Sequence, residues 1–176
     1  MKKRLVILLV LSILSSVVFC QTKGENLKID WPDEYKWKVG SNQENDKRHL
    51  IELIPGDERI DNWKTLGTMD SFKGVTGVPI ATTPDMMLGE AKKTAPDAKL
   101  TIFEKDEKAK NPWIIFKIEA PGFTNDPHPE SQLFYVILGQ PALYNNFVAV
   151  KKKELSDDFV KKWIKVFKAT ELIYQQ

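Results

Sequence analysis

The run LFYVIL, from Leu133 to Leu138, decides the fold because all six of its residues are apolar. A strand with one face in water alternates apolar and polar residues, so an unbroken apolar run predicts a strand that is buried on both faces. Such a strand needs a packed layer on each side. The sequence therefore predicts an α+β fold, in which a single antiparallel sheet of about six strands carries helices as a three-layer sandwich.

Three further segments of strand-like sequence accompany this run along the chain, at 100–104, 113–119 and 143–150. Consecutive strands that are joined by tight turns pair antiparallel. The four segments together predict a meander that forms one half of the sheet.

The N-terminal half of the chain predicts a hairpin. Arg48 to Ile54 has the composition of a strand, and before it Trp31, Asp33, Tyr35 and Trp37 recur at a spacing of two. That spacing predicts a partner strand with one aromatic face. The segment 60–69 fits both a helix and a strand.

Two helices are expected, and the C-terminal one has the clearer pattern. Ser156 is a suitable N-cap, and apolar residues then recur at helical spacing at Val160, Trp163, Ile164 and Phe167. Lysines occupy the opposite side, so this helix is expected to lie on the sheet. An earlier helix is expected to begin with Thr83 as its cap and to stop near Ala95, before Pro96.

The first twenty residues have the layout of a bacterial secretory signal. Lys2, Lys3 and Arg4 are followed by Leu5 to Phe19, which is apolar apart from three serines. This apolar run is short for a bilayer, where a spanning helix needs roughly 20 residues. The sequence therefore predicts a signal peptide at 1–20, a polar tether at 21–28 and a single α+β domain at 29–176.

Cys20 is the only cysteine, and it lies at the processing boundary, which leaves two routes open. A lipoprotein peptidase can cut before Cys20 and leave a lipidated cysteine, although Phe19 is bulky for that enzyme. Ordinary signal peptidase can instead cut after Cys20, with Val18 and Cys20 as the small recognition residues. Both routes predict an exported protein, periplasmic or secreted, or anchored to the membrane if Cys20 carries lipid.

The charge balance argues against a nucleic-acid partner. Three of the 26 basic residues but none of the 24 acidic residues precede Gln21, so the chain from Gln21 onward has a formal charge of −1. Nucleic-acid-binding domains normally present a clustered positive face.

A resemblance enters at Arg48 to Thr68, where a strand is followed by Pro-Gly-Asp-Glu at 55–58 and by an Asn-Trp pair at 62–63. This segment resembles one that recurs in small exported bacterial proteins of uncharacterised function, and Tyr135 to Leu172 is similar to them in plan. The order of elements also resembles the Mog1/PsbP-like sandwich. That second resemblance implies a protein-binding or accessory module, and it leans away from an enzyme.

One loop contains residues that can carry metal chemistry. Asp126, His128 and Glu130 lie in the segment 121–130, which is longer than a hairpin needs. Two carboxylates and an imidazole can ligate a metal such as zinc; the alternative is a solvated loop stiffened by proline. The only other histidine is His49, no G-x-S-x-G motif is present, and we expect no catalytic or cofactor-binding residue.

The aromatic residues Trp31, Tyr35 and Trp37 have two interpretations, a surface that binds a partner or part of the core. Taken together, the sequence predicts an exported, non-enzymatic binding or accessory module of the bacterial cell envelope, whose partner is a protein or another envelope component. The alternatives are a small metal-dependent or hydrolytic enzyme that uses the 121–130 loop, and a lipoprotein anchored through Cys20. Contact with a membrane is expected only if Cys20 is lipidated.

Overall fold

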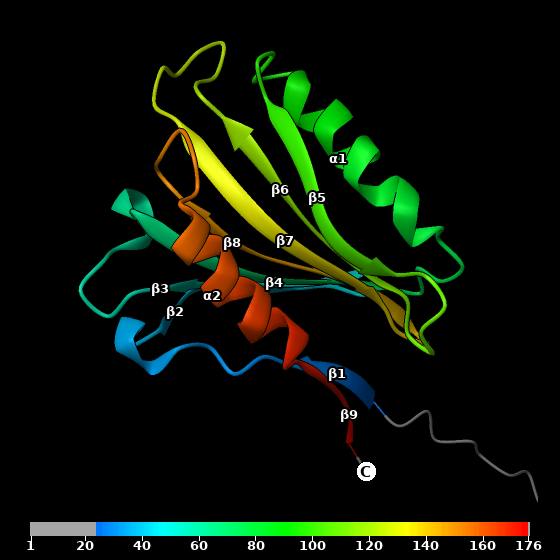
Figure 1. The fold of residues 1–176 in the computed structure, drawn as a ribbon. Coiled ribbons are helices and arrows are strands. Elements are labelled where there is room, and N and C mark those ends of the chain that lie inside the picture. Colours follow the sequence, from blue (N-terminus) through cyan, green and yellow to red (C-terminus); the bar gives the residue numbers. More distant parts are fainter. Residues whose placement is uncertain (1–23, 176) are drawn as a thin grey trace, which may run out of the picture.

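The apolar run at 133–138 lies inside β7, in a seven-stranded antiparallel sheet with the order β2-β3-β4-β8-β7-β6-β5 (Figure 1). The computed structural model describes residues 24–175. The strands of this sheet are β2 (Lys38–Glu44), β3 (Arg48–Ile54), β4 (Thr65–Lys73), β5 (Lys99–Asp106), β6 (Trp113–Ala120), β7 (Glu130–Leu138) and β8 (Ala142–Val150). The predicted α+β class and antiparallel sheet are confirmed, with seven strands where about six were expected. The prediction of a single sheet is wrong, since a small two-stranded sheet accompanies the large one.

The two helices pack on opposite faces of this sheet, as Figure 1 shows. Alternate residues of β7 serve the two faces: Leu133 and Tyr135 belong to the cluster that contains Trp163 of α2 (Asp157–Lys168), whereas Phe134 and Val136 belong to the cluster beneath α1 (Thr83–Lys92). The prediction that this strand is buried on both faces is therefore confirmed.

Helix α2 forms where the sequence predicts it. The hydroxyl of Ser156 stands at the N-cap and accepts a hydrogen bond from the backbone N–H of Phe159 at 3.4 Å. The apolar side buries Val160, Trp163 and Phe167. Burial of side chains of this size contributes roughly 1.5–3 kcal/mol each to the free energy of unfolding.

Helix α1 differs from the prediction at both of its ends. Thr83 is the first helical residue and not the cap, because the 3-10 turn η3 (Ile80–Thr82) runs directly into the helix and places Thr82 at the N-cap. The helix ends at Lys92, and a further turn follows in which the N–H of Ala95 donates to the carbonyl oxygen of Ala91 at 2.8 Å.

The strand expected over 31–37 is wrong. This segment contains the short 3-10 turn η1 (Asp33–Tyr35), Lys36 adopts a left-handed conformation with φ of 48°, and β2 begins only at Lys38. The aromatic side chains pack against the core on the α2 side of the sheet. The aromatic residues therefore lie in and around a turn, and this turn brings their rings together in one cluster. The ambiguous segment 60–69 contains the turn η2 (Ile60–Asn62) and the start of β4.

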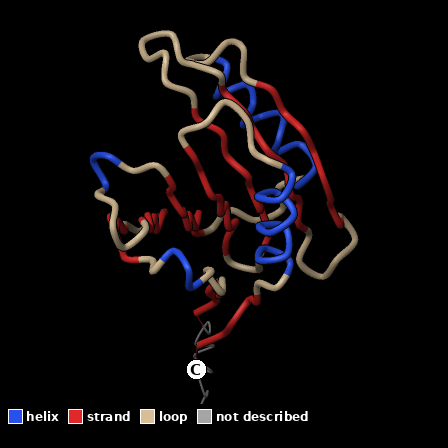
Figure 2. Tube along the Cα trace, turned by 60° about the vertical axis from the view of Figure 1, so that its left-hand side comes forward, coloured by secondary structure: helices blue, strands red, loops and turns tan. Residues whose placement is uncertain are grey.

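A second, two-stranded sheet joins the ends of the described chain. In it, β1 (Gly24–Lys28) pairs antiparallel with β9 (Glu171–Gln175), and Figure 2 shows this pair beside the C-terminus. Residues 24–28 thus form a strand where the sequence suggests a tether, because Glu25 and Leu27 alternate inward and are buried. The predicted signal peptide and Cys20 lie outside the described residues. Within 24–175, no helix is long and apolar enough to cross a membrane.

Candidate functional site

One end of the large sheet gathers the loops that carry most of the polar candidates. There the strand register places Thr65, Val150, Ser131 and Glu119 side by side on β4, β8, β7 and β6. Loops 55–64, 121–129 and 151–156 leave the sheet at this end, and α2 begins beside it. Two cavities open here, one on each side of the sheet.

The first, which we call the basic cavity, has a volume of about 400 Å³. It lies between the sheet end, the start of α2 and the η1 turn. Three lysines line it against one carboxylate, and two aromatic rings form part of its wall. The lining residues are Tyr35, Lys64, Thr65, Val150, Lys151, Lys152, Glu154, Leu155, Ser156 and Phe159.

Hydrogen bonds fix the backbone around the basic cavity. The carboxylate of Glu58 accepts from the N–H groups of Lys64 at 2.6 Å and of Thr65 at 3.1 Å. The hydroxyl of Ser131 donates to the carbonyl oxygen of Lys152 at 2.8 Å, and Glu119 accepts from the N–H of Leu155 at 2.8 Å. The strand ends that bear the lysines are therefore held in place, which lowers the entropic cost of binding a ligand.

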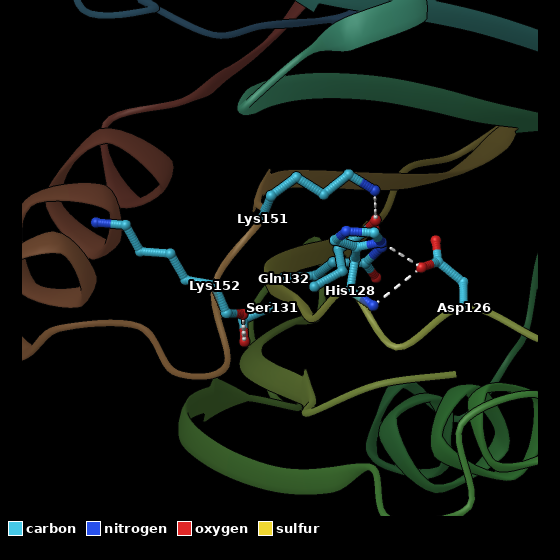
Figure 3. A network of polar contacts seen from close by, with 7 residues as sticks. Asp126, His128, Ser131, Gln132, Lys151 and Lys152 are labelled. Carbon is cyan, nitrogen blue, oxygen red and sulfur yellow. Dashed lines mark hydrogen bonds and ion pairs between the residues drawn. The ribbon is translucent and has the colours of Figure 1, made fainter. Parts of the chain in front are cut away.

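The three lysines differ in how their charge is balanced. The ammonium of Lys151 lies 2.7 Å from Glu130 Oε2 and 4.1 Å above the ring centre of Trp63. Among residues 24–175, no carboxylate lies within 4.0 Å of the ammonium of Lys64 or Lys152. Figure 3 shows that Lys151 and Lys152 leave the end of the strand in opposite directions.

The second, which we call the apolar cavity, lies between α1 and the sheet and has a volume of about 260 Å³. Its lining residues are Met87, Ala91, Ala95, Ile118, Ala120, Phe123, Glu130, Gln132 and Phe134. Glu130 in this wall forms the ion pair with Lys151 in the wall of the basic cavity. One ion pair thus connects the two cavities.

The candidate metal ligands of the 121–130 loop do not converge on one point. Nδ1 of His128 lies 2.6 Å from Oδ1 of Asp126, and both groups are exposed (Figure 3). The backbone N–H of His128 also donates to this carboxylate at 2.9 Å, and these two bonds lower the pKa of Asp126. Glu130 instead accepts from Gln132 and Lys151, each at 2.7 Å.

Within residues 24–175, no group of three or more His, Cys, Asp and Glu side chains is close enough to hold a metal ion. His49 lies on β3, where its Nε2 is 3.0 Å from Oδ1 of Asn42 on β2.

Trp31, Tyr35 and Trp37 are partly buried and pack against the core. The rings of Trp31 and Trp37 have centroids 5.5 and 6.2 Å from that of the buried Trp163. Tyr35 stacks on Trp37 at 4.8 Å, and it is the one member of this trio that lines the basic cavity.

The lysines of the basic cavity are the functional candidates that sequence reasoning missed. Lys151 to Lys153 are visible as a basic run, which is typical of a solvated surface. Lys64 joins them only because β4 pairs with β8, and nothing local in the sequence marks that contact.

Comparison with known proteins assigns no family, since the chain matches no protein-family model and no curated protein sequence.

Proposed function

We propose that this protein is an exported, non-enzymatic binding module of the bacterial cell envelope, which holds an anionic envelope component in the basic cavity. One observation supports this most directly: the lining of a cavity of about 400 Å³ includes Lys64 and Lys152, which form no ion pair within residues 24–175, and a single carboxylate, that of Glu154. Ligand sites are typically concave and mostly apolar, with a few placed polar groups. The basic cavity has this composition.

The walls suggest which ligand fits. A carboxylate or phosphate group would lie near the ammonium groups of Lys64 and Lys152, which act as point charges without a fixed bonding plane. A ring or short chain attached to that group would lie against Tyr35 and Phe159. The predicted ligand therefore combines a negative charge with a flat or apolar body.

The architecture supports a binding role by analogy. We propose that the large sheet with one helix on each face is a three-layer sandwich of the Mog1/PsbP-like type, in which the order of elements is similar. Such domains serve mainly as protein-binding or accessory modules, so the analogy favours binding over catalysis.

Export rests on the signal predicted at 1–20. Mass spectrometry of the mature N-terminus distinguishes the two processing routes, since one gives diacylglyceryl on Cys20 and the other a chain that starts at Gln21. A lipidated Cys20 would place the binding module at a membrane.

The binding proposal is tested by titrating the mature protein with D-glucuronate and glycerol 3-phosphate at low ionic strength, with glucose as the uncharged reference. We expect both anions to perturb the backbone NMR resonances of Lys152 and Ser156, and added salt to weaken the effect. The double substitution Lys64→Gln and Lys152→Gln should weaken binding roughly tenfold.

The matched control is Lys161→Gln with Lys165→Gln, which removes two lysines from the exposed side of α2. This variant should bind the anions as the parent does. Equal perturbation by glucose, or equal loss in both double variants, would contradict a specific role for the basic cavity.

A further inference from the structure

We infer that the apolar cavity beneath α1 is a second ligand site, for a small neutral molecule that has a single ring or short alkyl chain and one hydrogen-bond donor. This site lies on the opposite side of the sheet from the basic cavity, and it does not depend on the proposed anion binding.

The cavity exists because small side chains face each other across the layer boundary. Ala91 and Ala95 on the α1 side and Ala120 on the sheet leave a space that larger residues would fill. Protein interiors are normally packed as densely as organic crystals, with few voids larger than a water molecule. An apolar cavity of roughly 150 Å³ in another protein binds benzene. A volume of about 260 Å³ is therefore large enough for a ring with a substituent.

The polar groups of the wall define the charge of the ligand. Glu130 Oε1 accepts a hydrogen bond from Gln132, and Oε2 accepts one from Lys151. The carboxylate is ion-paired on one oxygen only, and each of its oxygens keeps a further lone pair for a ligand O–H or N–H. An anionic ligand would be repelled by Glu130, and a cationic one would compete with Lys151. A neutral donor fits both conditions.

The long loop 121–130 provides a cover for this site. Phe123 forms part of the wall, and the loop is joined to the end of α1 where Thr124 donates twice to the carbonyl oxygen of Thr94, from N–H at 2.7 Å and from Oγ1 at 3.0 Å. The extra length of this loop thus forms one wall of the apolar cavity.

The test uses the mature protein with labelled methionine methyl groups and phenol as the probe. Met87 lines the cavity, whereas its neighbour Met86 is 64% exposed and reports non-specific effects on the same helix. We expect phenol to shift the Met87 methyl resonance in a saturable way and to leave Met86 nearly unchanged. Benzoate, an anion of similar size, should not shift Met87 at the same concentration.

Two variants that fill the cavity complete the test, so that failure of one to fold does not prevent a result. Ala120→Leu and Ala91→Leu should each abolish the Met87 response, and Glu130→Gln should reduce the preference for phenol over benzoate. The proposal is overturned if phenol leaves Met87 unmoved up to about 10 mM, which would saturate a millimolar site. It is also overturned if both leucine variants fold and keep the response. Because the readout is on the α1 side, this result is independent of anion binding near Lys64 and Lys152.

Discussion

Gly67 on β4 is required because Trp31 crosses the sheet directly above it. A Cβ atom at this position would lie 2.5 Å from Cζ3 of Trp31, which is closer than carbon atoms approach in proteins. Trp31 cannot move aside freely, since its ring contacts both Trp37 and the buried Trp163. The absent side chain therefore allows the tryptophan cluster to form.

We predict that Gly67→Ala destabilises the fold by about 1–3 kcal/mol, the usual range for an overpacked core. Urea unfolding followed by tryptophan fluorescence measures this change. Gly89→Ala is the matched control, because a Cβ atom there meets nothing within 4 Å and the position is helical. That control should gain roughly 0.5–1 kcal/mol. Equal unfolding midpoints for Gly67→Ala and the parent would show that Trp31 is not confined.

Glu25 connects the N-terminal strand to the β7–β8 turn. The hydroxyl of Tyr144 donates to its backbone oxygen at 3.0 Å and to its carboxylate at 3.2 Å, and the N–H of Gln140 donates to the same carboxylate at 3.2 Å. Burial, together with the nearby carboxylate of Glu25, raises the pKa of Tyr144 well above its ordinary value. The phenol is therefore held in its protonated, donating form.

This contact predicts a specific loss of stability in alkali. Unfolded Tyr144 releases its proton near pH 10, whereas the folded protein keeps it to higher pH, so the folded state binds more protons and stability falls as pH rises above about 10. Tyr144→Phe should lower the free energy of unfolding by about 1–3 kcal/mol at pH 8, through loss of hydrogen bonds to Glu25. Thermal unfolding between pH 8 and 11 should show this difference narrowing above pH 10. A difference that stays constant with pH would contradict the role given to the phenol.

At the scale of elements, the sequence predicted those whose signals are local. Helix α2 combines a cap at Ser156 with apolar residues at helical spacing, and the strand over 48–54 has the bounds expected of it. The strand predicted over 31–37 was wrong. The aromatic spacing there suits a strand, but the segment contains Pro32, a 3-10 turn and the left-handed Lys36. The strand β9 was missed because its five residues gain their order from pairing with β1.

Trp163 holds α2 on the sheet. It is fully buried and packs against five other aromatic rings. We predict that Trp163→Ala costs about 3–5 kcal/mol, as is usual for removal of a large core side chain. Lys161→Ala, two residues away on the exposed side, should change stability by less than about 0.5 kcal/mol. Circular dichroism during urea unfolding compares the two variants, and similar midpoints would contradict the packing described for α2.

At the scale of the whole molecule, the cavities could not be predicted from the sequence, because they depend on pairings between distant segments. Lys64 reaches Lys151 and Lys152 through the β4–β8 pairing, and the alanines of the apolar cavity meet across a helix and a sheet. The sequence did single out the 121–130 loop. Its length proved more informative than its residue types, since Glu130 and Phe123 line a cavity while Asp126 and His128 pair with each other in solvent.

Because β1 pairs with β9, we predict that β1 stays ordered only when β9 is present. A chain that stops at Thr170 lacks β9, so the backbone of β1 loses its hydrogen-bonded partner. We expect faster amide hydrogen exchange at 24–28 in this shortened protein and unchanged protection in β6 and β7, which lie in the other sheet. Continued protection of β1 would mean that the Glu25 contacts suffice to hold it.

The same pairing brings Gly24 and Gln175, the two ends of the described chain, together at one pole of the molecule. One end of β7 leads to Gln140, which contacts Glu25, and the other begins at Glu130 between the two cavities. A strand of nine residues separates these points by about 30 Å. A surface or fusion partner joined directly to Gly24 or Gln175 therefore lies at one pole, and both cavities remain open to the surroundings at the other.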